Sequence, residues 1–146
     1  MSLDLKSVHH LCFGVGGSNG WIFVGIMTAL EQEFRCHKLS LYAQLEGASG
    51  ASVGSLFALA AVTNYAAIEF REFLKRCTLR YKHRMIFNVL DLPRHKGVMR
   101  MDVLQEMVED MLCAKFGCEN RGMTMRDLHE RTNKELIILT HNLSYE

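Results

Sequence analysis

The sequence contains little proline, no paired cysteine motif and no excess of charge of either sign. Pro93 is its single proline, and no repeat or low-complexity tract is present, so no segment is typical of a linker between domains. The five cysteines include no C-x-x-C pair, which argues against a disulfide framework or a zinc site and favours free thiols. A formal net charge of +1, without a basic tail, gives no indication of a nucleic-acid partner.

Long apolar runs are missing as well. No run reaches the ~18 residues that a membrane-spanning helix needs, and the first residues lack the charged and then apolar pattern of a secretory signal. We therefore expect a cytoplasmic protein, and contact with a membrane surface stays open. The hydrophobic fraction of 49% is enough for a core, and 146 residues suit a single domain covering 1–146.

Segments with strand and helix patterns alternate along the chain. Strands are predicted over 8–14, 42–48 and 135–143, and helices over 21–34, 52–62, 64–77, 102–116 and 124–129. This alternation predicts an α/β fold in three layers, with helices on both faces of a mostly parallel sheet. We expect four of these segments, which are largely apolar, to be buried: the strands 8–14 and 135–143 and the helices 21–34 and 52–62. Thr124 and Asp127 have the spacing of a helical capping box.

The segment 47–55, GASGASVGS, contains the pattern G-x-S-x-G once, in Gly50-Ala51-Ser52-Val53-Gly54. It lies between a predicted strand and a predicted helix, which is the context of a nucleophile elbow, where a serine occupies a strained turn. We identify Ser52 as the candidate nucleophile, because the positive end of a helix dipole favours a developing anion. Ser49 lacks the second glycine. The structural alternative is that these small residues only allow the helix to pack closely on the sheet.

A second glycine-rich turn, Gly16-Gly17-Ser18-Asn19-Gly20, ends the first predicted strand and opens the first predicted helix. Successive backbone N–H groups in such a turn can form an anion-binding nest. A dinucleotide-binding loop would need glycine at position 19, where Asn19 stands, and an acidic residue at the end of the second strand, which is missing. Because ligands bind beyond the carboxyl ends of parallel strands, we expect both glycine-rich turns to face one crevice.

Together, the stretches GVGGSNGWIFVGIMTALEQ and GASVGSLFALAAV resemble the patatin-like phospholipase family. That family has a glycine-rich loop of the form G-G-G-x-R-G, followed by G-x-S-x-G on a nucleophile elbow. KGVMRMDVLQEMVEDML and MTMRDLHERTNKELIILTHNLS are similar to its middle helix and its helix-then-strand segment, so the resemblance runs through 8–144. The chain departs from the family's loop at Val15, which replaces a glycine, and at Asn19, which replaces an arginine.

The resemblance implies a patatin-like fold and a hydrolase of lipid carboxylic esters, of phospholipase or lysophospholipase type. Ser52 would attack the ester carbonyl of the lipid, which is the implied partner. The backbone N–H groups of the glycine loop would hold the oxyanion, and the residues around the serine would shape the elbow. The implied oxyanion donors are Gly16, Gly17 and Ser18, and the implied elbow residues are Gly50, Ala51, Val53 and Gly54. The resemblance implies no metal and no organic cofactor.

The general base of that family is an aspartate in a D-G-[GA] motif on a later strand or loop. This sequence contains no Asp-Gly pair. An unassisted serine hydroxyl is a poor nucleophile, and loss of a positioned base costs ~10²–10⁴-fold in rate. We therefore expect either a domain truncated before the last strands of the family fold, with little activity by itself, or a non-catalytic lipid-binding or interaction module that retains the scaffold.

Two further hypotheses come from charged and titratable residues. The chain order allows a Ser…Asp…His triad in which Asp91 or Asp127 would act with His129 or His141. Residues 71–100 are rich in lysine and arginine with apolar residues interleaved. This segment is either a solvated surface or a contact with an anionic lipid surface.

Overall fold

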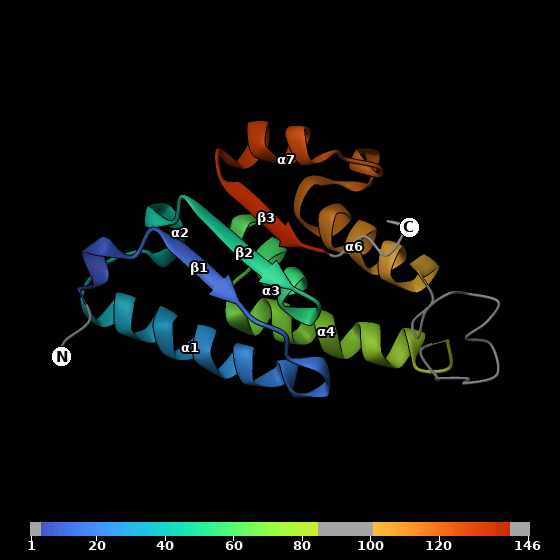
Figure 1. Ribbon diagram of the computed structural model, residues 1–146, viewed down its shortest axis with the longest axis horizontal. Coiled ribbons are helices and arrows are strands. Elements are labelled where there is room, and N and C mark those ends of the chain that lie inside the picture. Colours follow the sequence, from blue (N-terminus) through green and yellow to red (C-terminus); the bar gives the residue numbers. More distant parts are fainter. Residues whose placement is uncertain (1–3, 85–100, 141–146) are drawn as a thin grey trace, which may run out of the picture. The chain divides into compact units, whose positions relative to one another are not determined.

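The computed structural model describes residues 4–84 and 101–140 and has an α/β fold with an open, parallel, three-stranded sheet (Figure 1). The chain divides into two compact units, one formed by Met1–Phe70 with Thr124–Glu146 and the other by Arg71–Met123. The single domain expected from the sequence stays a prediction. Among the described residues, no helix combines the length and the apolar character that crossing a membrane requires.

The first unit holds the sheet. Its elements are η1 (Leu5–Ser7), β1 (His10–Phe13), η2 (Gly17–Gly20), α1 (Trp21–Cys36), α2 (Leu41–Gln44), β2 (Gly47–Ala51), α3 (Val53–Val62), α7 (Met125–Thr132) and β3 (Glu135–Leu139). The strand order is β1-β2-β3, and both neighbouring pairs are parallel. In the register, Phe13 lies beside Gly50, and Gly50 lies beside Ile138. The carboxyl ends of all three strands therefore lie together at the same end of the sheet.

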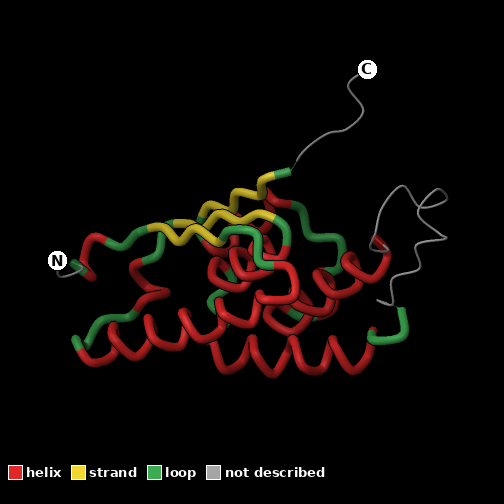
Figure 2. Tube along the Cα trace, turned by 60° about the horizontal axis from the view of Figure 1, so that its bottom comes forward, coloured by secondary structure: helices red, strands yellow, loops and turns green. Residues whose placement is uncertain are grey.

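Helix α3 covers one face of this sheet and is the centre of the unit. Its residues from Phe57 to Val62 are all buried, as expected for a helix that is apolar on every side. The ring of Phe57 lies 5.9 Å from that of Phe13 on β1 and 5.2 Å from that of Phe23 on α1. Helix α1 therefore packs with α3 on the same side of the strands, as the tube view also shows (Figure 2).

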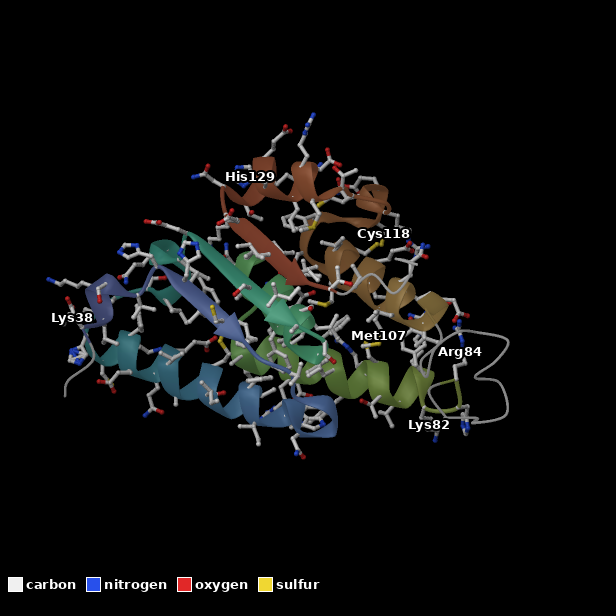
Figure 3. All side chains as sticks on the ribbon, viewed as in Figure 1. Lys38, Lys82, Arg84, Met107, Cys118 and His129 are labelled. Atoms are coloured by element: carbon white, nitrogen blue, oxygen red, sulfur yellow. The ribbon has the colours of Figure 1, made fainter. Side chains whose placement is uncertain are left out.

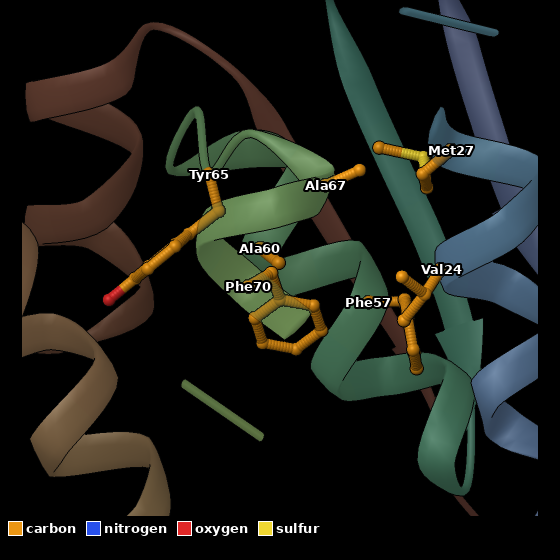
Figure 4. A pocket seen from close by; sticks show the side chains of 7 residues that line it. All are labelled: Val24, Met27, Phe57, Ala60, Tyr65, Ala67 and Phe70. Carbon is orange, nitrogen blue, oxygen red and sulfur yellow. The ribbon is translucent and has the colours of Figure 1, made fainter. Parts of the chain in front are cut away.

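The packing between α1 and α3 leaves one small apolar void. Its volume is about 10 Å³, which is room for at most one water molecule. Figure 4 shows its lining, to which Val24 and Met27 come from α1, and Phe57 and Ala60 from α3. The remaining lining residues are Tyr65, Ala67 and Phe70. This interior is closely packed and offers no room for a ligand.

Three expectations about these elements were wrong in part. The strand expected over 42–48 is β2, Gly47–Ala51, and the residues before it form the short helix α2, whose N-terminus is capped by the Ser40 hydroxyl. Strands β1 and β3 are largely exposed rather than buried, because they are the two outer strands of the described sheet. Helix α1 is buried on one side only, and Trp21 and Ile22 are exposed.

Only one face of the described sheet is covered by a helix of the first unit. Side chains alternate between the two faces of a strand, so Ile137 and Leu139 point away from the face that carries Phe13 and Gly50. They are 42% and 63% exposed. A second helical layer on this face is not seen among residues 4–84 and 101–140 and stays a prediction.

Helix α7 begins with the capping box expected from the sequence. The Thr124 hydroxyl accepts a hydrogen bond from the Asp127 N–H, and the Asp127 carboxylate accepts one from the Thr124 N–H at 2.8 Å. The hydrogen bonds that the Asp127 carboxylate accepts from the Thr124 N–H and hydroxyl hold the pKa of Asp127 below its usual value. The helix ends at Asn133, which adopts a left-handed backbone conformation.

Helix α4 (Ala67–Tyr81) begins in the first unit and continues into the second, which also contains α6 (Met101–Phe116) and η4 (Cys118–Asn120). Within the second unit, the guanidinium of Arg84, which is labelled in Figure 3, donates two hydrogen bonds to Glu106, at 2.7 and 2.8 Å, and one to Asp102 at 2.9 Å. Tyr81 is buried and donates to Asp110, and burial together with this bond raises the pKa of Tyr81 to about 12. Helix α6 is therefore joined to the segment that follows α4 by charged hydrogen bonds.

Candidate functional site

Ser52 lies in the turn between β2 and α3, at the end of the sheet where the strands have their carboxyl ends. Its backbone has φ 55° and ψ −130°, a conformation that residues with a side chain rarely adopt. The side chain is exposed and forms no capping hydrogen bond with α3. A serine that begins a helix usually caps it with its hydroxyl. Here the strained backbone of Ser52 directs the hydroxyl toward the solvent, so that it does not cap α3.

The two glycines that flank Ser52 are required by close backbone contacts. A Cβ atom on Gly50 would lie 2.3 Å from the carbonyl oxygen of Gly54, and a Cβ atom on Gly54 would lie 2.4 Å from the carbonyl oxygens of Phe13 and Gly14. Any larger residue would therefore separate α3 from the strands. Both glycines are buried, whereas Ala51, the last residue of β2, is half-buried.

The glycine loop after β1 has the backbone geometry of an anion-binding nest. Gly16 has φ −126° and ψ −21°, and Gly17 has φ +49°. A left-handed residue in such a turn lets successive backbone N–H groups point to one side, as in an anion-binding nest. Ser18 follows in η2, and the turn closes with a hydrogen bond from the Asn19 N–H to the Gly16 carbonyl at 2.9 Å. Among the described turn and cap hydrogen bonds, none uses the N–H of Gly16 or Gly17.

Val53 joins this loop to the elbow. A Cβ atom on Gly16 would lie 2.9 Å from Cγ1 of Val53, and one on Gly20 would lie 3.1 Å from its Cγ2. The loop therefore packs directly on the residue that follows Ser52. The two glycine-rich turns therefore lie together at the carboxyl ends of β1 and β2. There, backbone N–H groups could donate hydrogen bonds to an oxyanion formed at Ser52.

Ser49, the competing serine, lies elsewhere. It is inside β2, half-buried, and its hydroxyl lies 2.9 Å from the Cys12 thiol on β1. Its side chain belongs to the sheet face that carries Ile137, as the strand register requires. Ser49 therefore lies within the regular part of β2, whereas Ser52 stands at the N-terminus of α3.

No general base for Ser52 is found among the described residues. No hydrogen bond joins the Ser52 hydroxyl to a carboxylate or an imidazole in residues 4–84 and 101–140. The described aspartates have other partners, since Asp4 caps η1, Asp127 caps α7, Asp102 pairs with Arg84, and Asp110 pairs with Arg80. Asp91 lies outside the described residues.

The triad hypothesis finds no support in the described histidines. His129 Nδ1 lies 3.0 Å from the Lys134 carbonyl, in the turn between α7 and β3. This turn leads into the amino end of β3, whereas Ser52 follows the carboxyl end of β2. His9 pairs with Glu46 at 2.9 Å, also before the strands begin. His141 lies outside the described residues.

The basic segment 71–100 is described only in its first half. There, Lys75 pairs with Glu72, Arg80 with Asp110, and Arg84 with Asp102 and Glu106. Much of the described positive charge is therefore matched by nearby carboxylates. Arg94, Lys96 and the apolar run 85–87 lie outside the described residues.

A group of exposed apolar side chains beside the glycine loop was not expected from the sequence. Val15 in the loop is 76% exposed, and Trp21 and Ile22 in the first turn of α1 are 47% and 62% exposed. Ile26 follows one turn after Ile22 on the same side of the helix and is 48% exposed. The signal was present in the sequence, because no formally charged residue occurs between Lys6 and Glu31. This charge-free surface begins in the glycine loop, and Gly16 of that loop packs on Val53, the residue after Ser52.

No group of three or more histidine, cysteine, aspartate or glutamate side chains in the described part of the chain could hold a metal ion. Comparison of the chain with protein-family models finds no match, and comparisons with curated proteins and with solved structures find none either.

Proposed function

We propose that the chain carries the nucleophile and oxyanion loop of a patatin-like serine hydrolase that acts on carboxylic esters of lipids. The observation that carries this proposal is the strained, exposed Ser52 packed through Val53 against the nest at Gly16 and Gly17. In acyl transfer, the serine oxygen attacks the ester carbonyl, and the carbonyl oxygen becomes an anion that needs preorganised donors. Gly16, Gly17 and Ser18 would supply those donors from the backbone.

The substrate class is supported by the surface beside the site. The exposed side chains of Val15, Trp21, Ile22 and Ile26 would leave water when they contact acyl chains, and no charged group of the same segment would have to be desolvated. A soluble, polar ester would gain nothing from this surface. We therefore favour a substrate presented by a lipid aggregate or a membrane surface, with the protein in contact with it from the cytoplasmic side.

The second candidate is a lipid-binding or interaction module without catalysis. It is favoured by the missing Asp-Gly pair and by the partners that occupy every described aspartate. The fold that positions Ser52 would serve both functions, and only the chemical reactivity of its hydroxyl distinguishes them.

A fluorophosphonate probe tests the proposal directly, because it reacts with serines that are activated by their surroundings. We expect covalent labelling of the wild-type chain that is lost in Ser52→Ala and retained in Ser49→Ala, a matched control three residues earlier. Labelled peptides would place the adduct at position 52. Absence of labelling in a chain that is folded by circular dichroism would favour the binding module or a site that is incomplete in this chain.

A further inference from the structure

A cavity in the first unit is lined by α7 and by the beginning of β3. Its volume is about 310 Å³, at the lower end of the roughly 300–1,000 Å³ that ligand-binding cavities have. The cavity borders the amino end of β3, whereas Ser52 follows the carboxyl end of β2, so it does not belong to the ester site. The residues that line it are Met125, Leu128, His129, Lys134, Glu135 and Leu136.

Three of these residues form an apolar wall. Met125 and Leu128 lie three positions apart on α7 and therefore on the same side of the helix, and Leu136 comes from β3. Leu128 is 4% exposed and Met125 is 51% exposed, so the wall runs from the core to the surface. The apolar part of a ligand would leave water when it contacts this wall.

His129, which is labelled in Figure 3, gives the cavity a hydrogen-bond acceptor. Its Nδ1 lies 3.0 Å from the Lys134 carbonyl oxygen, which can only accept, so Nδ1 carries the hydrogen. In the neutral ring, Nε2 then has a lone pair, and it forms no hydrogen bond within residues 4–84 and 101–140. The free nitrogen of this ring can therefore receive an N–H group of a ligand.

Glu135 gives the same cavity a negative charge that is weakly matched. Its Oε2 lies 3.7 Å from His10 Nε2, which is longer than a hydrogen bond. The Lys134 ammonium donates instead to the Tyr42 carbonyl at 2.7 Å and to the Asn64 side-chain oxygen, and neither of these partners lines the cavity. The polar side chains that remain for a ligand are therefore acceptors with a net negative charge.

We propose that this cavity binds a small organic cation, an amidinium or ammonium group carried on an apolar body. The N–H groups of the cation would donate to the Glu135 carboxylate and to Nε2 of His129. The apolar body would pack on Met125, Leu128 and Leu136. An amidinium has two parallel N–H groups, which match the two oxygens of a carboxylate. An anion would find no side-chain donor here, and a charge that leaves water without a partner is costly.

Benzamidine, an amidinium on a benzene ring, is the probe that tests the charge requirement. Its neutral analogue benzamide and its anionic analogue benzoate have nearly the same shape. Each is titrated into the ¹⁵N-labelled full chain, and the backbone amide signals are followed by NMR. We expect benzamidine to shift the signals of residues 125–136 until they saturate, and benzamide to bind roughly tenfold more weakly, because it lacks a charge-assisted hydrogen bond. Benzoate should leave these signals unchanged.

Substitutions on α7 and β3 locate the site. Glu135→Gln keeps the size of the side chain and removes its charge, so it should weaken benzamidine binding roughly tenfold. Glu130→Gln is the matched control, because Glu130 is an exposed glutamate of α7 that does not line the cavity, and it should leave the affinity unchanged. Met125→Trp should fill the cavity and abolish binding, and the exposure of Met125 allows the larger side chain without disturbing the core.

Labelling of Ser52 by fluorophosphonate concerns the opposite end of the strands, so this inference and the proposed ester chemistry fail independently. The cation site is overturned if benzamidine and benzamide bind with the same affinity, or if the signals that shift lie outside residues 125–136. It is also overturned if Glu130→Gln weakens binding as much as Glu135→Gln does.

Discussion

Gly54 and Gly14 touch so closely that a single added Cβ atom on Gly54 would lie 2.4 Å from the Gly14 carbonyl oxygen. This contact joins the first turn of α3 to the end of β1, directly beside Ser52. It explains in steric terms why the pattern G-x-S-x-G must end in glycine here. The same contact also fixes where the glycine loop leaves β1, so the elbow and the loop are positioned by one another.

Gly54→Ala should therefore destabilise the protein by about 2–3 kcal/mol, as overpacking against backbone does. Gly25→Ala is a matched control, because a Cβ atom on Gly25 meets nothing within 4 Å and the residue is exposed on α1. The control should gain about 0.5–1 kcal/mol from better helix propensity. Urea unfolding measures both changes. Equal stability of the two variants would show that the elbow is loosely packed.

The strain at Ser52 predicts that glycine at this position is more stable than serine. Ser52→Gly should raise the free energy of unfolding by roughly 1 kcal/mol, since glycine adopts φ 55° without steric cost. Ser55→Gly, three residues later inside α3, should instead lower it by about 0.5–1 kcal/mol. Thermal unfolding of both variants measures the contrast. A destabilised Ser52→Gly would mean that the hydroxyl contributes more than the strain costs.

Contact with lipid should be visible in the fluorescence of Trp21, which is the only tryptophan of the chain. Its ring is 47% exposed, so burial among acyl chains should shift its emission to the blue when phosphatidylcholine vesicles are added. Ile22→Ser, beside it on α1, should weaken the shift. Ile68→Ser, which replaces another exposed isoleucine on α4, should not. An emission spectrum that vesicles leave unchanged would contradict lipid contact at this surface.

The ion pair of Glu106 with Arg84 should stabilise the folded protein at neutral pH and cease to do so at acidic pH. Its hydrogen bonds to Arg84 lower its pKa from 4.5, so the folded state binds its proton less readily than the unfolded state. The contribution is present above pH 4.5 and is lost as the pH falls through the lowered value. Glu106→Gln should flatten the loss of stability at low pH, and Glu109→Gln, on the same helix, should leave it as in the wild type. Unfolding curves between neutral and acidic pH measure this difference.

Lys134 should show a pH dependence of the same sign, but on the alkaline side. Its ammonium is buried, donates to the Tyr42 carbonyl at 2.7 Å and to the Asn64 side-chain oxygen, and burial lowers its pKa from 10.5. The unfolded state therefore holds this proton more tightly, so stability relative to Lys134→Met should rise as the pH increases from the lowered pKa to 10.5. Lys6→Met, an exposed control, should show no such trend.

Local patterns in the sequence were enough to predict part of the fold. The burial of α3 was predicted from its uninterrupted apolar segment and is observed. The capping box at Thr124 and Asp127 is also formed as expected. The turn at Ser52 was also predictable, because glycines on both sides of a serine between a strand and a helix describe a local geometry. The catalytic role of Ser52 stays a prediction.

Features that depend on distant partners were not predictable. Strand β2, Gly47–Ala51, consists of glycine, alanine and serine and has little strand propensity of its own. It is a strand because β1 and β3 pair with it on both sides. Ile137 and Trp21 are exposed because no other described element packs on their side of the strand or helix. An apolar sequence pattern alone does not determine which side is covered. A general base for Ser52 could not be predicted for the same reason, because it would come from a residue distant in the sequence.

The ladder between β2 and β3 has a consequence for how the chain folds. It pairs Ser49 with Ile137, residues more than 80 positions apart, whereas β1 and β2 lie within 40 positions of each other. Closing the longer loop costs more chain entropy, and contacts of large sequence separation slow folding. We expect β1, β2 and α3 to assemble first during synthesis, and the far edge of β2 to stay open until residues 135–139 have left the ribosome. In that interval the nascent chain would be most dependent on chaperones.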